Sequence, residues 1–195
     1  MKKTEISILA GFLVAVIFCS ISAFASDCDR VRRDVLRLHI LANSDDRRDQ
    51  QLKLSVRDAV LKASPQLFDP AASADEAAQS ARAHLDDFRR IAEQTLRAQG
   101  CQDTVRVQLC KSYFETRTYD DLTLPAGVYN ALRIEIGKGA GHNWWCVLFP
   151  ALCIPAAQDS AREVFTPREK QVVTAPKYQA KFALVEFWEG LKNRS

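Results

Sequence analysis

The sequence predicts an α+β fold: a mixed or antiparallel sheet of about four strands with two helices packed on one face, plus a C-terminal helix. Apolar residues recur at steps of three and four over residues 52–63 and 74–96, which is the spacing of amphipathic helices. From residue 104 to residue 136 the period changes to two, which is the spacing of strands. With 195 residues, of which 47% are apolar, the chain is long enough to bury one core of this kind.

The two internal helices are predicted from their caps. Asn43 or Ser44 starts the first helix, which ends before Pro65 because the residue preceding a proline disfavours helical geometry. The second helix is long: it starts at the capping box of Ser73 and extends to Gly100, a typical left-handed stop.

The strands are predicted from short apolar or alternating runs. Because the last three follow one another through short loops, antiparallel neighbours are favoured. The two helices can then cover one face of the sheet, and an aromatic-rich segment forms the final helix. The expected strands lie at residues 31–41, 105–109, 113–119 and 128–136, and the final helix at 177–192.

The N-terminus has the order of residues found in a secretory signal. Lys2 and Lys3 precede an apolar stretch over residues 6–18, followed by Ala23-Phe24-Ala25, so cleavage is expected before Ser26. The apolar region is also about the 20 residues needed to span a bilayer, so an uncleaved anchor stays open. The predicted layout is a signal peptide (1–25), a secreted α+β domain (26–155), a flexible connector (156–175) and a C-terminal helix (176–195).

The charge distribution argues against a nucleic-acid partner. The chain has 27 basic and 24 acidic residues, a net charge of +3, and no run of lysines or arginines. A nucleic-acid-binding domain needs a clustered basic surface, so no nucleic acid is expected as a partner.

Export places five cysteines where disulfides persist. Cys146 and Cys153 are seven residues apart with a proline between them, so a disulfide is geometrically reasonable, with reduced buried thiols as the alternative. Because five is odd, at least one thiol stays free or pairs between molecules, and the states of Cys28, Cys101 and Cys110 stay unassigned. The spacing lacks the paired short C-x-x-C units of zinc sites, so no metal is expected.

Two patterns after the last predicted strand suggest a phosphate-binding loop and a catalytic pair, respectively. Gly137, Gly139 and Gly141 resemble a phosphate loop, but His142 stands where the dinucleotide fingerprint needs glycine. A flexible turn without a cofactor is therefore favoured. His142 and Cys146 could serve as base and nucleophile, although a disulfide would remove the thiolate. An exported cysteine-dependent hydrolase of cell-wall amide or peptide bonds is the alternative function.

Trp144 and Trp145 begin an apolar run that continues to Ile154. The run is too short to cross a bilayer. Three interpretations stay open: a lid on the sheet, an exposed patch that binds a partner, and a peripheral membrane contact through the tryptophans.

Several segments resemble the stage II sporulation protein R family. They read LRLHILANSD at 36–45, DQQLK at 49–53, VRDAV at 56–60, LPAGVY at 124–129 and GKGAGHNWWCVLFPALC at 137–153. The similarity extends from about residue 34 to residue 153, and its motifs are long and specific.

The resemblance implies a non-enzymatic signal of endospore formation. Members of the family are exported from the forespore into the intermembrane space, where they trigger a mother-cell membrane aspartic protease, stage II sporulation protein GA, to cleave the sigma-E precursor. The implied partner is the extracytoplasmic part of that protease. The family supplies no catalytic residue, and the matching side chains are candidates for partner contact: Asn43, Ser44, Asp45, Asn143, Trp144 and Trp145.

Overall fold

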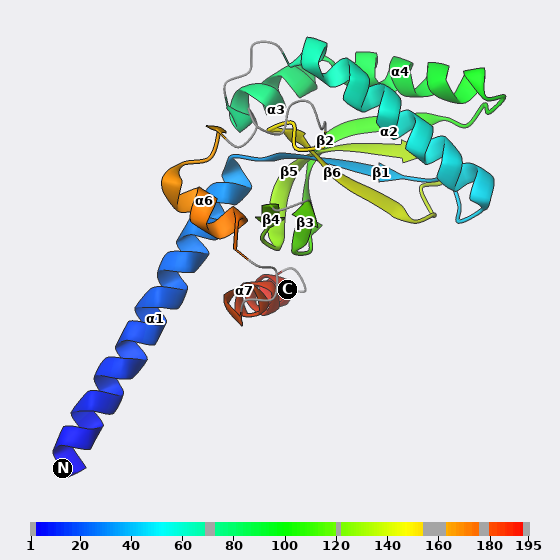
Figure 1. The fold of residues 1–195 in the computed structure, drawn as a ribbon. Coiled ribbons are helices and arrows are strands. Elements are labelled where there is room, and N and C mark those ends of the chain that lie inside the picture. Colours follow the sequence, from blue (N-terminus) through cyan, green and yellow to red (C-terminus); the bar gives the residue numbers. More distant parts are fainter. Residues whose placement is uncertain (1–2, 69–72, 120–121, 154–162, 176–179, 193–195) are drawn as a thin grey trace. The chain divides into compact units, whose positions relative to one another are not determined.

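The structure is a computed structural model that describes residues 3–68, 73–119, 122–153, 163–175 and 180–192 (Figure 1). It divides into two compact units. The sheet unit comprises Arg33–Phe114 and Val128–Thr166. The terminal unit comprises Met1–Arg32, Glu115–Gly127 and Pro167–Ser195.

The sheet unit is built on a mixed sheet of four strands. Its strands are β1 (Leu36–Leu41), β2 (Val105–Phe114), β5 (Gly127–Ile136) and β6 (Asn143–Phe149), in the order β2-β5-β1-β6. Strand β1 pairs in parallel with β5, where Leu38 lies opposite Leu132, and antiparallel with β6, where Leu38 lies opposite Cys146. The predicted α+β class with about four strands is confirmed.

The prediction of separate strands at 105–109 and 113–119 is wrong. Residues 105–114 form the single strand β2, whose length matches that of its neighbour β5. The polar residues near Lys111 interrupt the apolar pattern of the strand, because they lie on an exposed part of it. The pattern therefore does not show that the strand is continuous. Residues after the strand form a separate hairpin in the terminal unit, β3 (Arg117–Tyr119) with β4 (Leu122–Leu124).

Strand β1 is buried on both faces. Leu36, Leu38 and Ile40 are fully buried in a core that they share with residues of three internal helices, which lie on one side of the sheet (Figure 1). These helices are α2 (Arg47–Leu67), α3 (Ala74–Ala83) and α4 (Leu85–Ala98). Arg37 and His39 occupy the opposite face and are also buried. Two-sided burial is typical of a strand with a parallel neighbour.

Helix α2 (Arg47–Leu67) packs the stripe Leu52, Val56 and Val60 into this core. The predicted start was two to three residues too early, because Asp46 is the N-cap. The predicted end before Pro65 is wrong: Pro65 lies in the last turn, and the helix continues through it to Leu67. Because proline has no N–H to donate to the carbonyl four residues earlier, it costs one helical hydrogen bond close to the helix end.

The long helix predicted over 74–99 is two helices, α3 (Ala74–Ala83) and α4 (Leu85–Ala98). The hydroxyl of Ser73 accepts a hydrogen bond from the backbone N–H of Glu76, so the predicted cap is present. His84 interrupts the helix with φ −108° and ψ 19°, and its carbonyl accepts from the N–H groups of Asp87 and Phe88. It therefore starts a new helix. The left-handed stop at Gly100 is found with φ 69°.

Residues 143–149 form strand β6, which the sequence pattern did not predict. The strand pairs with β1 from Asn143 opposite Leu41 to Phe149 opposite Leu36, with an irregularity near Leu36. The tryptophan segment therefore belongs to the sheet, and the interpretation as a lid that covers the sheet is wrong for these residues. The continuous apolar run concealed the strand, because the period of two is lost when both faces are buried.

The terminal unit contains a continuous helix, α1 (Lys3–Arg33), which passes through the predicted cleavage site. The strand predicted from residue 31 begins only at Leu36. Residues 27–33 favour helix because the pairs Asp27–Arg30 and Asp29–Arg32 have i,i+3 spacing. Cys28 and Val31 have the same spacing and are buried.

The predicted flexible connector, 156–175, contains helix α6 (Pro167–Val173). The connector prediction is wrong for these residues, because Glu169, Val172 and Val173 are buried and Pro167 suits the first helical position. Residues 154–162 lie outside the described residues. The predicted C-terminal helix is present as α7 (Ala180–Lys192), and residues 176–179 and 193–195 also lie outside.

The burial of β1 gives a test of the fold. Replacing Leu38 with alanine should lower the free energy of unfolding by about 2–5 kcal/mol, because a fully buried side chain is removed from the core. Val128→Ala in β5 is the control: this side chain is 40% exposed, so the change should stay within about 1 kcal/mol. Urea denaturation measures both, and equal losses would contradict the assigned faces.

Candidate functional site

Two segments that are far apart in the sequence meet at one end of the sheet. They are the loop that follows β1, residues 42–46, and the turn between β5 and β6, residues 137–142. Because β1 and β5 are parallel and β6 is antiparallel to β1, the end of β1 lies beside the end of β5 and the start of β6. The backbone N–H of Gly141 donates to the carbonyl of Ala42 at 2.9 Å, which joins the loop to the turn.

Asn43 and Ser44 hold the loop in place. The Asn43 amide and the Ser44 hydroxyl donate to the same Asp49 carboxylate oxygen, at 2.8 and 2.7 Å. The Asn43 side-chain oxygen in turn accepts from the backbone N–H of Lys138 at 3.0 Å. The side chains of Asn43 and Ser44, both candidates for partner contact, therefore form hydrogen bonds within the site and stabilise its loop. The pKa of Asp49 is lowered, chiefly because the Ser44 hydroxyl stabilises the ionised carboxylate, with a further contribution from Asn43.

The glycines of the turn allow this close approach. Gly137 has φ 58°, and a Cβ there would collide with the Asn43 side chain. A Cβ at Gly141 would collide with the Ser44 carbonyl. The glycine pattern is thus explained by packing of backbone against the loop, which agrees with the interpretation as a turn.

Lys53 lies under the turn and was not predicted as a site residue. It is only 4% exposed, and its Nζ donates to the His142 carbonyl at 2.8 Å and to Gln50 Oε1 at 2.6 Å. Gln50 donates from Nε2 to the Ser44 carbonyl at 2.8 Å. Burial lowers the pKa of Lys53. The i,i+3 spacing of Gln50 and Lys53 within one matching segment was the signal that could have identified them.

Asp45 links the loop to the turn at the surface. Its carboxylate accepts from the backbone N–H of His142 at 2.6 Å and also contacts the His142 ring. The hydrogen bond from the His142 ring is the largest cause of the lowered pKa of Asp45, followed by the bond from the backbone N–H. We call five exposed residues at this end of the sheet the rim: Asp45, Lys138, Ala140 and His142 of the two segments, and Asn143 at the start of β6.

Trp144 and Trp145 lie on opposite faces of β6. Trp144 contributes to the core on the helix side, where the Arg57 guanidinium lies 4.4 Å from its ring centre. Trp145 stacks on His39, with ring centres 3.9 Å apart and an angle of 12° between planes. Both tryptophans are half-buried, so they do not form one exposed patch.

His39 connects Trp145 to the rim. Its Nε2 lies 3.1 Å from Asn143 Oδ1 and, as the donor, would hold the Asn143 amide in place. Burial is the main cause of the lowered pKa of His39, so the neutral ring is favoured at pH 7. The Trp145 ring also contacts Phe114 edge-on at 4.5 Å.

Cys146 and Cys153 form a disulfide with a Cα–Cα distance of 6.4 Å. Cys146 is buried in the core, and its sulfur is occupied by this bond. The His142 ring meanwhile pairs with Asp45, so the two residues are not arranged as a nucleophile and a base. Cys28, Cys101 and Cys110 are thiols, and their burial decreases in that order.

Within the described ranges, no group of three or more His, Cys, Asp or Glu side chains could hold a metal ion. The site consists of two braced loops, an exposed rim and a half-buried aromatic face. Its chemistry suits recognition by hydrogen bonds and shape.

Comparisons with known proteins give one consistent match. The family model described as stage II sporulation protein R matches residues 32–159. A protein of Bacillus subtilis (strain 168) named "Stage II sporulation protein R" is 43% identical over 118 residues, which cover 60% of this chain and 53% of the relative. The chain thus spans about half the length of this curated relative. No solved structure matches significantly.

The carboxylate that braces the loop gives a pH-dependent prediction. Because the folded-state pKa of Asp49 is below its unfolded value of about 3.9, its stabilising effect is present above that pH and is lost as the pH falls through the folded pKa. Asp49→Asn should therefore lower the free energy of unfolding by about 1 kcal/mol at pH 7, and the difference from the unmodified protein should shrink toward pH 3.

Urea denaturation at a series of pH values measures this difference. Ser44→Ala removes one of the two donors, so it should give a smaller loss with the same dependence on pH. A constant difference between Asp49→Asn and the unmodified protein over the whole range would contradict the role assigned to the carboxylate.

Proposed function

Because the chain belongs to the stage II sporulation protein R family, which gives it a role in sporulation, we propose that it is a secreted intercellular signal of endospore formation. It acts in the space between the forespore and mother-cell membranes. There it triggers a membrane aspartic protease of the mother cell, stage II sporulation protein GA, to process the sigma-E precursor. The observation that carries this proposal is the family match over residues 32–159, which includes all four strands of the sheet unit.

Export is supported by helix α1. It is the one helix among the described residues that is long and apolar enough to cross a membrane, and it lies at the N-terminus as a signal sequence does. Its apolar part ends near the predicted cleavage site before Ser26. A route out of the forespore cytoplasm is required for any contact with an extracytoplasmic partner.

The rim is the surface that we assign to the protease. Its side chains are exposed, while the loops that carry them are held by buried or half-buried partners such as Asp49 and Lys53. A preorganised surface loses little conformational entropy on binding, so its polar groups can give both affinity and specificity. Asn143, Asp45 and Lys138 supply an amide and charges of both signs within this surface.

Activation by binding needs a preference between two states of the protease. A ligand shifts an equilibrium only by the difference between its affinities for the two arrangements. The signal therefore binds the active arrangement of the extracytoplasmic part more tightly than the resting one. In this mechanism the chain supplies a surface and makes or breaks no covalent bond.

The alternative of a cysteine-dependent hydrolase gains no support from the geometry. The attacking sulfur would be Cys146, which is bonded to Cys153 and buried. Thiol chemistry needs a free thiolate, so the site as described favours the signalling role.

Co-expression tests the proposal. The full chain, the candidate protease and the sigma-E precursor are produced in a non-sporulating host, and precursor cleavage is scored by immunoblot. Cleavage should depend on the chain. Lys138→Glu and Asn143→Ala should weaken it about tenfold, equivalent to about 1.4 kcal/mol of binding free energy, because both change exposed side chains of the rim.

Lys62→Glu is the matched control, since Lys62 is an exposed lysine of α2 outside the rim and should tolerate the same charge reversal. Circular dichroism checks that all variants fold. Cleavage that is independent of the chain would overturn the proposed function, whereas equal activity of Lys138→Glu, Asn143→Ala and the control would overturn the assignment of the rim.

A further inference from the structure

Helix α7 carries large apolar side chains on two sides. Phe182 and Val185 are buried within the terminal unit. Phe187 and Trp188 are 68% and 62% exposed, and Leu184 and Leu191 are each 48% exposed. A helix that has large apolar side chains outside its packed face normally contacts a second apolar environment on that other side.

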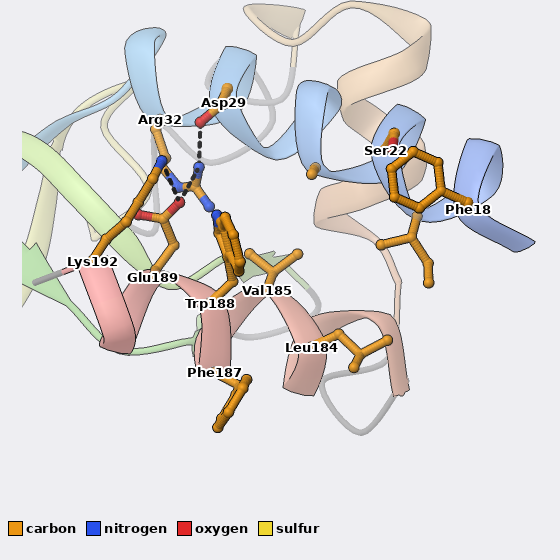
Figure 2. Close-up of a pocket in the computed structure, with 12 residues that line it drawn as sticks. Phe18, Ser22, Asp29, Arg32, Leu184, Val185, Phe187, Trp188, Glu189 and Lys192 are labelled. Atoms are coloured by element: carbon orange, nitrogen blue, oxygen red, sulfur yellow. Dashed lines mark hydrogen bonds and ion pairs between the residues drawn. The ribbon is translucent and has the colours of Figure 1, made fainter.

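The terminal unit places α7 against the last part of α1. The ring centres of Phe24 and Phe182 are 5.2 Å apart, and Arg32 lies 3.8 Å from the Glu189 carboxylate. Between the two helices is a cavity of about 460 Å³, whose wall on the α1 side is formed by Phe18, Ile21, Ser22, Ala25, Asp29 and Arg32 (Figure 2).

This position coincides with the boundary between the apolar and charged parts of α1. The large side chains from Ile6 to Phe18 are exposed, whereas Asp27, Asp29 and Arg30 follow two to three turns later. About 20 helical residues span roughly 30 Å, the thickness of the hydrocarbon core. When the apolar part of α1 lies in a bilayer, as it does for a signal sequence or an anchor, Phe24 and its partner Phe182 are at the outer interface.

We propose that α7 is an interfacial helix that binds the surface of the lipid bilayer. Tryptophan and phenylalanine are favoured at the boundary between headgroups and acyl chains. Figure 2 shows Phe187 pointing away from α1, where it can enter the bilayer surface. On the polar side, Glu189 pairs with Arg32 and lies 3.9 Å from Lys192, so its charge is compensated.

Lipid is favoured as the binding partner of α7 because the apolar surface of α7 adjoins that of α1. The described part of α7 has two acidic residues, Glu186 and Glu189, so it has no polybasic character and binding should be driven by apolar burial. Neutral lipids should therefore suffice. Removal of residues 1–25 would uncover Phe182 and leave α7 with more apolar surface.

This inference does not depend on the proposed protease, because lipid contact is measured with the chain alone. The full chain is reconstituted into phosphatidylcholine vesicles that contain brominated acyl chains, which quench nearby tryptophans. The chain has three tryptophans, and α7 contains Trp188. Trp188 should account for most of the quenching, so about one third of the fluorescence should be quenchable, and Trp188→Phe should abolish this fraction.

Trp144→Phe is the matched control and should leave the quenchable fraction unchanged, since the Trp144 ring lies against Arg57 in the sheet unit. Phe187→Glu should reduce the quenching of Trp188 because a charge is placed in the interface. Equal quenching in Trp188→Phe and the unmodified chain would overturn the proposal. So would a dimer in detergent that Phe187→Glu dissociates, because the exposed face would then be covered by a second copy.

Discussion

The burial of both faces of β1 is the constraint on which the sheet unit depends. Leu38 and its neighbours on the same face pack against the helices, while Arg37 on the other face is fully buried. The Arg37 guanidinium lies 4.2 Å from the Phe114 ring centre and 5.0 Å from that of Tyr129, and its Nε donates to the Cys146 carbonyl at 3.1 Å. Such contacts offset part of the cost of burying a cation. They also tie β1 to β2, β5 and β6, and so fix where the two loops of the site meet.

Local patterns predicted the elements better than their arrangement. The stripe of α2, the cap at Ser73 and the stop at Gly100 follow from interactions within a few residues, and the structure contains them. Strand order was not predictable, because the insertion of β1 between β5 and β6 depends on pairing across about 100 residues. The break between α3 and α4 at His84 was not predictable for another reason: the helical spacing of apolar residues continues through this position.

The site was predictable only in part. The resemblance identified Asn43, Ser44 and Asp45, but not that the first two face inward to Asp49. Lys53 resembles any solvated helix lysine until its contact with the His142 carbonyl is known. An exposed patch was one of three interpretations of the tryptophan pair, but alternation along β6 sends the two rings to opposite faces. At this end of the sheet the exposed side chains are therefore those of the rim, and the two tryptophans are half-buried.

Hydrogen–deuterium exchange of the full chain with and without the extracytoplasmic part of the protease is the most direct test of the proposed signalling surface. Binding through the rim should slow amide exchange in residues 43–46 and 137–143 and leave the exposed side of α2 unchanged. Protection confined to other segments, or an absence of protection under conditions where the precursor is cleaved, would contradict the claim that the chain signals by presenting this surface.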